Sequence, residues 1–311
     1  MAELFGIVAP VFALIVMGAA AIGFRLLDAP AVRGMSDFVF FAAMPALLFR
    51  SVAGAPPLRL LDVAGSFIVG AFILFAAAVV LARRVFRVRL AQASVFGLNC
   101  VFGNTVMLGI PIVDAAFGPE GVANLLAVVA FHSGLLLPVA TILIEADAGM
   151  GRSPWQVLAV TAKGLLRNPV VMSIVLAFAW RATGLGFAEP VSRLLVLLGA
   201  AGPPLALFCL GASLPRPATL FAPGRGLMQI AAGSVLKLLA MPALVAALAH
   251  LAGVSGVAFA VVVLASALPT GANAFLLARR FDTNPEESAS TVVVSTVLSV
   301  VTLTLLLEWL R

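Results

Sequence analysis

The sequence is poor in charge: Asp, Glu, Lys and Arg make up 10% of its 311 residues, whereas hydrophobic residues make up 63%. Soluble domains carry about 25% charged and about 45–50% apolar residues, so this composition excludes a soluble globule and a disordered chain. A membrane-spanning helix uses about 20 apolar residues. Ten such helices would occupy roughly 200 residues, which leaves no room for a large extramembrane domain.

Signatures of enzymes and metal sites are also missing. Cys100 and Cys209 lie inside apolar segments without metal-ligand spacing. The chain has no Walker loop, no HExxH string and no Gly-x-Ser-x-Gly elbow. No Asp or Glu lies in the middle of an apolar run, which disfavours a cation antiporter built on intramembrane carboxylates. The sequence therefore predicts no enzyme, no metal site and no cofactor.

Ten apolar runs, separated by proline, glycine and charge clusters, predict an all-α membrane protein with ten transmembrane helices. The runs cover residues 4–24, 33–53, 63–82, 91–113, 122–145, 169–188, 191–213, 227–249, 254–278 and 287–310. The longest connection, 146–168, separates a first five-helix half at 1–145 from a second at 169–311. Five helices on each side give the halves opposite orientations, the arrangement of an inverted repeat.

Basic residues are distributed unevenly between the two sides of the predicted bundle. Alternate connections hold 13 Lys and Arg residues, among them the cluster from Arg83 to Arg89, and the opposite side holds five. The positive-inside rule places the 13 in the cytoplasm and both termini outside. Topology thus explains the net charge of +6 without a nucleic-acid partner.

The fourth helix of each half contains helix breakers and small polar residues near its middle. Helix 4 includes Gly103, Asn104, Thr105 and Pro111, and helix 9 includes Pro269, Thr270, Gly271 and Asn273. Proline removes a backbone donor, and the freed groups are tolerated in a bilayer where they line a cavity or are packed in protein. Corresponding breaks in both halves point to a transporter's binding site. The alternative is a pair of kinked helices packed through Gly and Ala.

These strings carry a family resemblance. The segments GNTVMLGIP at 103–111, PTGANAFLLA at 269–278 and MPALLFRSVA at 44–53 resemble those of the auxin efflux carrier family. The resemblance implies a bile-acid-symporter-like architecture in which helices 1, 2, 6 and 7 form a scaffold. Helices 3–5 and 8–10 would then form a mobile transport domain, with helices 4 and 9 crossing at their breaks. It also implies a homodimer through the scaffold and a bacterial inner membrane.

Two ionisable side chains lie deep in apolar runs. Lys237 lies about 15 Å into helix 8, where an ammonium is costly and needs a partner. It either attracts an anionic substrate, or takes the electrostatic role of a coupling cation, or is a structural lysine held by carbonyls at the helix breaks. His132 in helix 5 suits a proton-coupled step, because histidine has a reference pKa of about 6.5. A neutral, hydrogen-bonded histidine is the alternative.

The sequence favours a secondary transporter of a small organic anion that works by alternating access at the two breaks. Half-helix amides would bind carboxylate oxygens, while Asn104, Thr105 and Asn273 donate neutral hydrogen bonds. The resemblance suggests malonate or malate first, auxin-like weak acids second and sodium-coupled uptake of a larger anion third. A membrane sensor or enzyme is the alternative of a different class, although no catalytic constellation supports it.

The predicted topology can be tested with a membrane-impermeant thiol reagent on intact cells. In a background without Cys100 and Cys209, Arg87→Cys should stay unmodified, because the positive-inside rule places it in the cytoplasm. Arg193→Cys, on the predicted outer side, is the labelled control. Modification of the residue 87 variant from outside would contradict the topology.

Overall fold

The computed structural model describes residues 2–53, 60–147, 155–156, 166, 169–213 and 225–310. Within these ranges the regular structure is helical and no β-strand occurs, which confirms the all-helical fold class. Six segments are long and apolar enough to cross a membrane: Ala29–Arg50, Ala64–Phe86, Thr105–Val129, Glu189–Ala212, Gly226–Leu251 and Pro285–Leu310. The ten-helix count and the inverted repeat stay predictions. The 146–168 linker lies mostly outside the described residues.

The chain divides into two compact units. Unit 1 comprises Met1–Leu58, Val106–Leu126 and Lys163–Leu214, and unit 2 comprises Arg59–Thr105, Ala127–Ala162 and Pro215–Arg311. Each unit therefore takes segments from both predicted halves of the chain.

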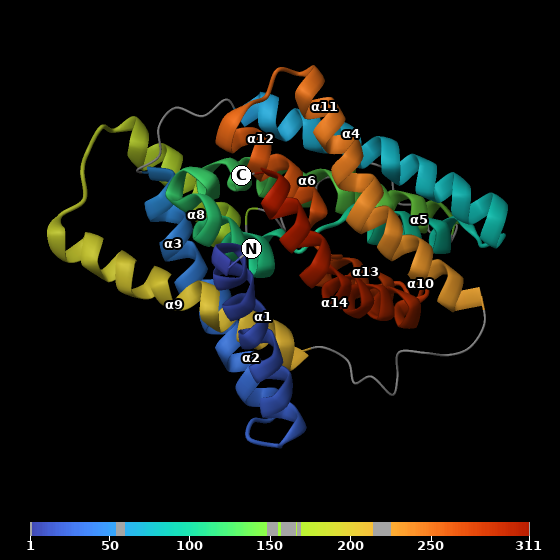
Figure 1. Cartoon of the computed structure of the whole chain (residues 1–311), viewed down its shortest axis with the longest axis horizontal. Helices are drawn as coiled ribbons and strands as arrows, with labels where there is room; N and C mark the ends of the chain where they lie inside the picture. The colour runs from blue at the N-terminus through green and yellow to red at the C-terminus, as the bar shows by residue number, and fades with distance from the viewer. Residues whose placement is uncertain are drawn as a thin grey trace. The chain divides into compact units, whose positions relative to one another are not determined.

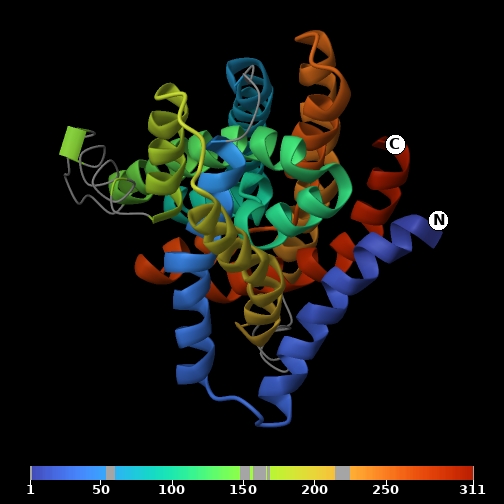
Figure 2. The ribbon, with the colours of Figure 1, turned by 90° about the vertical axis from the view of Figure 1, so that its left-hand side faces the viewer.

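Unit 1 contains α1 (Ala2–Gly23), α2 (Ala29–Phe38), α3 (Met44–Ala53), α8 (Pro169–Ala182), α9 (Glu189–Ser213) and residues 110–126 of α6. Glycines bring α1 and α9 close together. Figures 1 and 2 show α1 and α2 joined by a short turn. A Cβ atom added to Gly18 of α1 would lie 1.9 Å from the Phe208 carbonyl oxygen of α9. A Cβ added to Gly211 of α9 would lie 1.8 Å from the Ile15 oxygen of α1. Only glycine allows backbones to approach so closely, as in other packed transmembrane helices.

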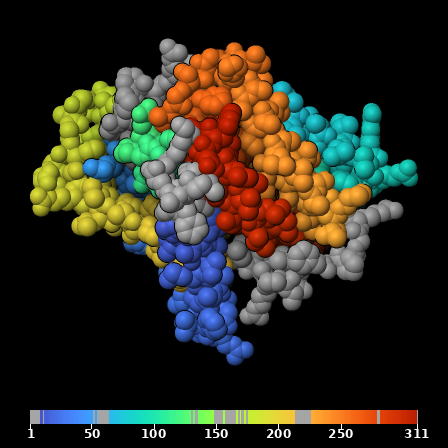
Figure 3. Space-filling model, viewed as in Figure 1, coloured from blue at the N-terminus to red at the C-terminus, as the bar shows by residue number. Residues whose placement is uncertain are grey.

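Unit 2 is built around two short, buried helices. Its elements are α4 (Leu60–Leu81), α5 (Leu90–Val101), the end of α6 (Ile110–Asp147), α10 (Arg225–Val235), α11 (Met241–Leu251), α12 (Gly256–Ala267), α13 (Ala272–Arg280) and α14 (Pro285–Leu310). Residues 93–101 of α5 and 260–267 of α12 are all buried. Both segments are buried on all sides and mostly apolar, the pattern of a core helix. Figure 3 shows α10 and α11 (orange) beside α14 (red).

Three π-helical segments precede prolines at one fixed spacing. Val39–Ala43, Thr105–Gly109 and Leu236–Ala240 end two residues before Pro45, Pro111 and Pro242, respectively. A proline has no amide hydrogen and its ring clashes with the carbonyl four residues earlier. We infer that the wider π-helical turn accommodates that carbonyl, and such turns often occur at functional sites.

A sharp kink at Gly118 divides α6 into two helical stretches. The φ of 61° and ψ of −157° at Gly118 belong to a region that only glycine occupies readily. The sequence predicts two helices here, at 91–113 and 122–145, and Gly118 lies between them, so the helical direction changes between the end of the first predicted helix and the start of the second.

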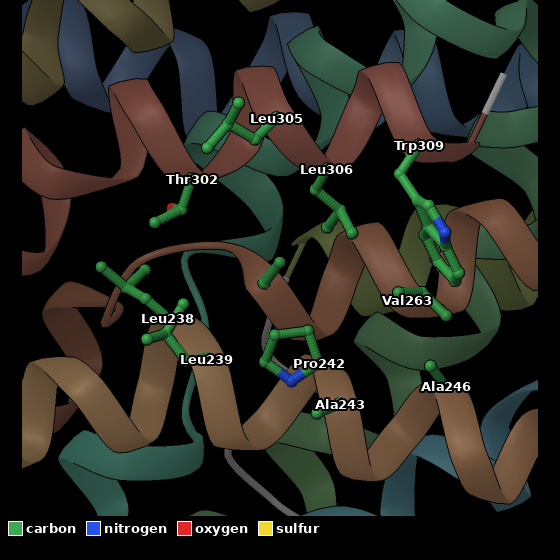
Figure 4. Close-up of a pocket in the computed structure, with 11 residues that line it drawn as sticks. Leu238, Leu239, Pro242, Ala243, Ala246, Val263, Thr302, Leu305, Leu306 and Trp309 are labelled. Carbon is green, nitrogen blue, oxygen red and sulfur yellow. The ribbon is translucent and has the colours of Figure 1, made fainter.

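An apolar groove of about 380 Å³ lies between α11, α12 and α14 in unit 2. Figure 4 shows its lining: Leu238, Leu239, Pro242, Ala243, Ala246, Val263, Ala267, Thr302, Leu305, Leu306 and Trp309. Thr302 supplies the one hydroxyl in this set, and none of these side chains is charged. Carboxylates need hydrogen bonds or charge partners when they leave water. The groove therefore does not suit an organic anion.

Gly18→Ala tests the close packing of α1 on α9. The added methyl would overlap the Phe208 carbonyl, so the helices must separate, at a cost of about 1–3 kcal/mol. We expect the purified protein to melt several degrees lower. Gly23→Ala is the matched control on the same helix, because no atom lies within 4 Å of the added carbon. Equal melting temperatures for the two variants would contradict the packing.

Candidate functional site

The two interrupted helices of unit 2 meet at their breaks, which form a crossover defined by residues 102–104 and 269–271. Helix α5 ends at Val101 and α12 ends at Ala267. Leu268, which precedes Pro269, is extended with a ψ of 145°, as proline requires of its neighbour. The amide of Asn104 donates to the Pro269 carbonyl at 2.8 Å, and the amide of Gly271 donates to the Phe102 carbonyl at 2.8 Å. The breaks thus satisfy each other's backbone groups.

Close backbone approach makes glycine necessary at the crossover. A Cβ atom at Gly271 would lie 2.9 Å from the Gly103 oxygen and 3.0 Å from the Phe102 ring. At Gly103 an added carbon would lie 3.4 Å from the Ala265 oxygen. The carbonyl contact at Gly271 is too close for a side chain and the contact at Gly103 is an ordinary contact distance, so we infer that Gly271 in particular is needed for the pairing of the two chain segments.

Side chains from α5 and α14 hold the crossover in place. The Thr270 hydroxyl donates to the Asn99 carbonyl at 2.8 Å, and the Thr270 amide donates to the Ser295 hydroxyl at 3.1 Å. Ser288 of α14 donates to Asn99 Oδ1 at 2.8 Å. Asn99 is not among the site residues that the sequence predicts, although a polar amide two turns after Gln92 in a mostly apolar helix is a signal that could have identified it.

Lys237 belongs to the π-helical segment Leu236–Ala240, and its side chain reaches the carboxyl end of α12. Its side chain is fully buried, and Nζ donates to the Ser266 carbonyl at 2.5 Å. Ser266 belongs to the last turn of α12, where carbonyl oxygens lack helical partners and the helix dipole favours a cation. Nζ would also lie 3.6 Å from a Cβ atom at Gly103, which follows the end of α5. The ammonium therefore lies beside the carboxyl ends of α12 and α5.

His132 of α6 holds the crossover through its ring. Nε2 accepts a hydrogen bond from the Gly103 amide at 3.1 Å, so the proton of the neutral ring is on Nδ1. The ring lies 3.9 Å from the Phe102 ring and 5.6 Å from the Phe67 ring, centroid to centroid. Protonation of Nε2 would break the bond to Gly103. This geometry favours the hydrogen-bonded role of His132 over the proton-coupling role.

The other predicted site residues differ in exposure. Thr105 and Thr270 are buried, and Asn104 is buried with no hydrogen-bond partner for Nδ2. Asn273, in the first turn of α13, is exposed. Pro111 belongs to unit 1, whereas the crossover belongs to unit 2. Asn104 Nδ2 and His132 Nδ1 are buried donors for which the described residues supply no hydrogen-bond partner, and Asn273 is an exposed donor just after the crossover in the sequence.

The crossover suits an anion by its chemistry. Its contacting side chains are Asn99, Thr270, Ser295, His132 and Lys237, and none of these is acidic. Neutral donors at a helix N-terminus and a nearby ammonium both favour negative charge. Among the described residues, no group of three or more His, Cys, Asp and Glu side chains gathers as a metal site would require.

His132→Phe tests the role of the imidazole as an acceptor. Phenylalanine keeps an aromatic ring but leaves the buried Gly103 amide without a partner, which costs about 1–3 kcal/mol. We expect a clear fall in melting temperature. The control is His250→Phe on the exposed surface of α11, which should melt like the parent. If both variants melt alike, the hydrogen bond to Gly103 contributes nothing.

Comparison with known proteins agrees with a transport site. A family model described as "Membrane transport protein" matches residues 4–307. The chain is also similar to a protein of Rhizobium meliloti (strain 1021) named "Putative malonate transporter". The two are 28% identical over 319 aligned residues, which cover 100% of this chain and 97% of the relative. The family match spans nearly the whole sequence, so the chain belongs to the membrane transport protein family that includes the auxin efflux carriers and is a membrane transporter rather than an enzyme.

Proposed function

We propose that the protein is a secondary active transporter of a small dicarboxylate, with malonate as the first candidate. The observation that carries this proposal is the crossover, where two broken helices present neutral donors beside a buried ammonium and no contacting carboxylate. The name of the Rhizobium relative supports malonate as the first substrate to test. Auxin-like weak acids and sodium-coupled uptake of a larger anion are the remaining candidates.

The proposed binding mode uses the N-terminal end of α13. One substrate carboxylate accepts hydrogen bonds from first-turn amides of α13 and from Asn273, which is exposed there. Asn104 Nδ2, for which the described residues supply no hydrogen-bond partner, donates to the same ligand, and Thr105 lies beside it in the chain. Lys237 is fully buried and contributes through its charge rather than by contact.

The proposed transport cycle is alternating access in which unit 2 moves against unit 1. Unit 1 holds the predicted helices 1, 2, 6 and 7 together with residues 106–126, and unit 2 holds the crossover. This division supports a scaffold and a transport domain, the arrangement called an elevator. A homodimer through the scaffold, outside termini and a bacterial inner membrane belong to the same proposal.

Uptake of labelled malonate into proteoliposomes tests the function. We expect uptake above that of protein-free vesicles, and competition by unlabelled malonate and malate. Imposed pH and sodium gradients separate proton coupling, sodium coupling and uniport. Competition by an aromatic monocarboxylate but not by malate would favour an auxin-like weak acid instead. No saturable uptake of either class would contradict the proposal.

Asn104→Ala and Asn273→Ala test the proposed contacts. Each removes a neutral hydrogen bond worth about 1 kcal/mol, so malonate affinity should fall roughly fivefold while folded yield changes little. Asn124→Ala is the control, because Asn124 Nδ2 already donates to the Glu120 carbonyl of its own helix. Parent-like affinity in both test variants would make the crossover purely structural.

Lys237→Met tests the electrostatic role of the ammonium. If the charge supports anion binding, the variant keeps its fold, binds malonate more weakly and loses the part of transport that depends on membrane potential. Lys237→Arg keeps the positive charge but replaces the compact ammonium with a planar guanidinium, so it tests charge separately from geometry. A structural lysine predicts unchanged affinity and flux, and melting temperature could even rise because a desolvated charge is removed.

A further inference from the structure

A second polar site lies in unit 2, in a small recess between α5, α10 and α14. Its lining residues are mostly polar and come from three helices: Gln92, Val95, Phe96, Asn99, Gln229, Asn284, Glu287 and Thr291. The enclosed volume is about 10 Å³, room for one water-sized particle. Six polar side chains around so small a space are unusual in a chain with 63% hydrophobic residues.

Helix α10 leaves space for this recess by its glycines. Gly226, Gln229 and Gly233 are spaced by three and four residues and therefore share one helix face. A Cβ atom at Gly226 would lie 3.4 Å from Glu287 Oε1, and one at Gly233 would lie 3.4 Å from Thr291 Cγ2. This face of α10 thus lies against the carboxylate and the threonine of α14, with buried Gln229 between the two glycines.

The recess offers oxygen atoms whose orientation is fixed. Ser288 donates to Asn99 Oδ1 at 2.8 Å, which fixes the amide and leaves this oxygen a second lone pair. The Thr291 hydroxyl donates to the Glu287 carbonyl at 2.7 Å, so its own oxygen remains an acceptor. Gln92 Nε2 donates to Asn284 Oδ1 at 2.8 Å and ties α5 to the residue before α14.

The charge of the recess matches one monovalent cation. Glu287 is the one acidic residue in the lining. Divalent ions are usually held by more carboxylates or by additional water and phosphate ligands. Asn99 is in the last turn of α5, where the helix dipole favours a cation. The N-terminus of α14 carries roughly half a positive charge. This is smaller than the full negative charge of the Glu287 carboxylate, so the helix end offsets that charge only in part.

We propose that this recess binds one sodium ion, held by Glu287, Asn99, Thr291 and Gln229. Its small volume favours sodium over the larger potassium ion. The Asn99 carbonyl accepts the Thr270 hydroxyl, so the ion would stabilise the same residue that holds the crossover. As a coupling ion the sodium rests on the proposed transport function, but its binding can be measured without substrate.

Thermal melting of the purified full-length protein tests the site, with sodium chloride as the probe. We expect the melting temperature to rise with sodium, compared with potassium chloride and choline chloride at equal ionic strength, because a ligand that binds the folded state stabilises it. Glu287→Gln and Thr291→Val should shift the sodium midpoint about tenfold or more. Glu286→Gln is the matched control, since this neighbour is exposed and outside the lining.

The outcomes separate this site from the proposed transport function. Equal effects of sodium, potassium and choline would overturn the sodium site, as would an unchanged sodium midpoint in Glu287→Gln. If that variant does not fold, the Thr291→Val midpoint decides in its place. Malonate uptake without any sodium effect on melting would remove the ion site and keep the transporter. A sodium effect without uptake of malonate would keep the ion site and remove the dicarboxylate function.

Discussion

Every polar group of the backbone needs a partner inside a bilayer, and unit 2 meets this constraint by pairing one helix break with another. Two reciprocal amide–carbonyl bonds join residues 102–104 to residues 269–271. Neither break could be buried alone, because each freed amide or carbonyl would remain unsatisfied at a cost of several kcal/mol. The buried helices α5 and α12 therefore depend on each other, although 154 residues separate Val101 from Gly256.

The remaining polar side chains of unit 2 complete this pairing. His132 accepts the Gly103 amide, which the backbone pairing leaves unused, and Lys237 donates to a carbonyl at the carboxyl end of α12. The Ser295 hydroxyl of α14 accepts the Thr270 amide, and the Asn99 carbonyl of α5 accepts the Thr270 hydroxyl. Polar side chains, whose burial in an apolar environment costs free energy, are thus concentrated where the helical hydrogen bonds are interrupted. The ligand donors left over, Asn104 Nδ2 among them, are a consequence of how the breaks are closed.

Local chemistry predicted the breaks, and long-range geometry decided their partners. Pro269 and Gly103 locate the interruptions in the sequence, because proline and glycine weaken a helix wherever they occur. The bond from Ser288 to Asn99 joins residues 189 positions apart, and no periodicity within either helix identifies that pair. The exposure of Asn273 could not be predicted from the sequence either, since it depends on which face of the nine-residue helix α13 is covered. The serines and threonines of α14 largely bond to carbonyls of their own helix, so their spacing reports packing.

The route of the backbone between the two units has a mechanical consequence. The boundaries at Thr105–Val106 and Leu126–Ala127 fall inside the π-helical segment and inside α6, not in loops. A displacement of one unit against the other must therefore be absorbed by torsion and bending of helical backbone. The stretch between these boundaries already contains two irregular points, the wide turn before Pro111 and the glycine bend at Gly118. In the proposed transport cycle this helical stretch would therefore have to bend or twist at its two boundaries, whereas a loop would follow the same displacement without deforming a helix.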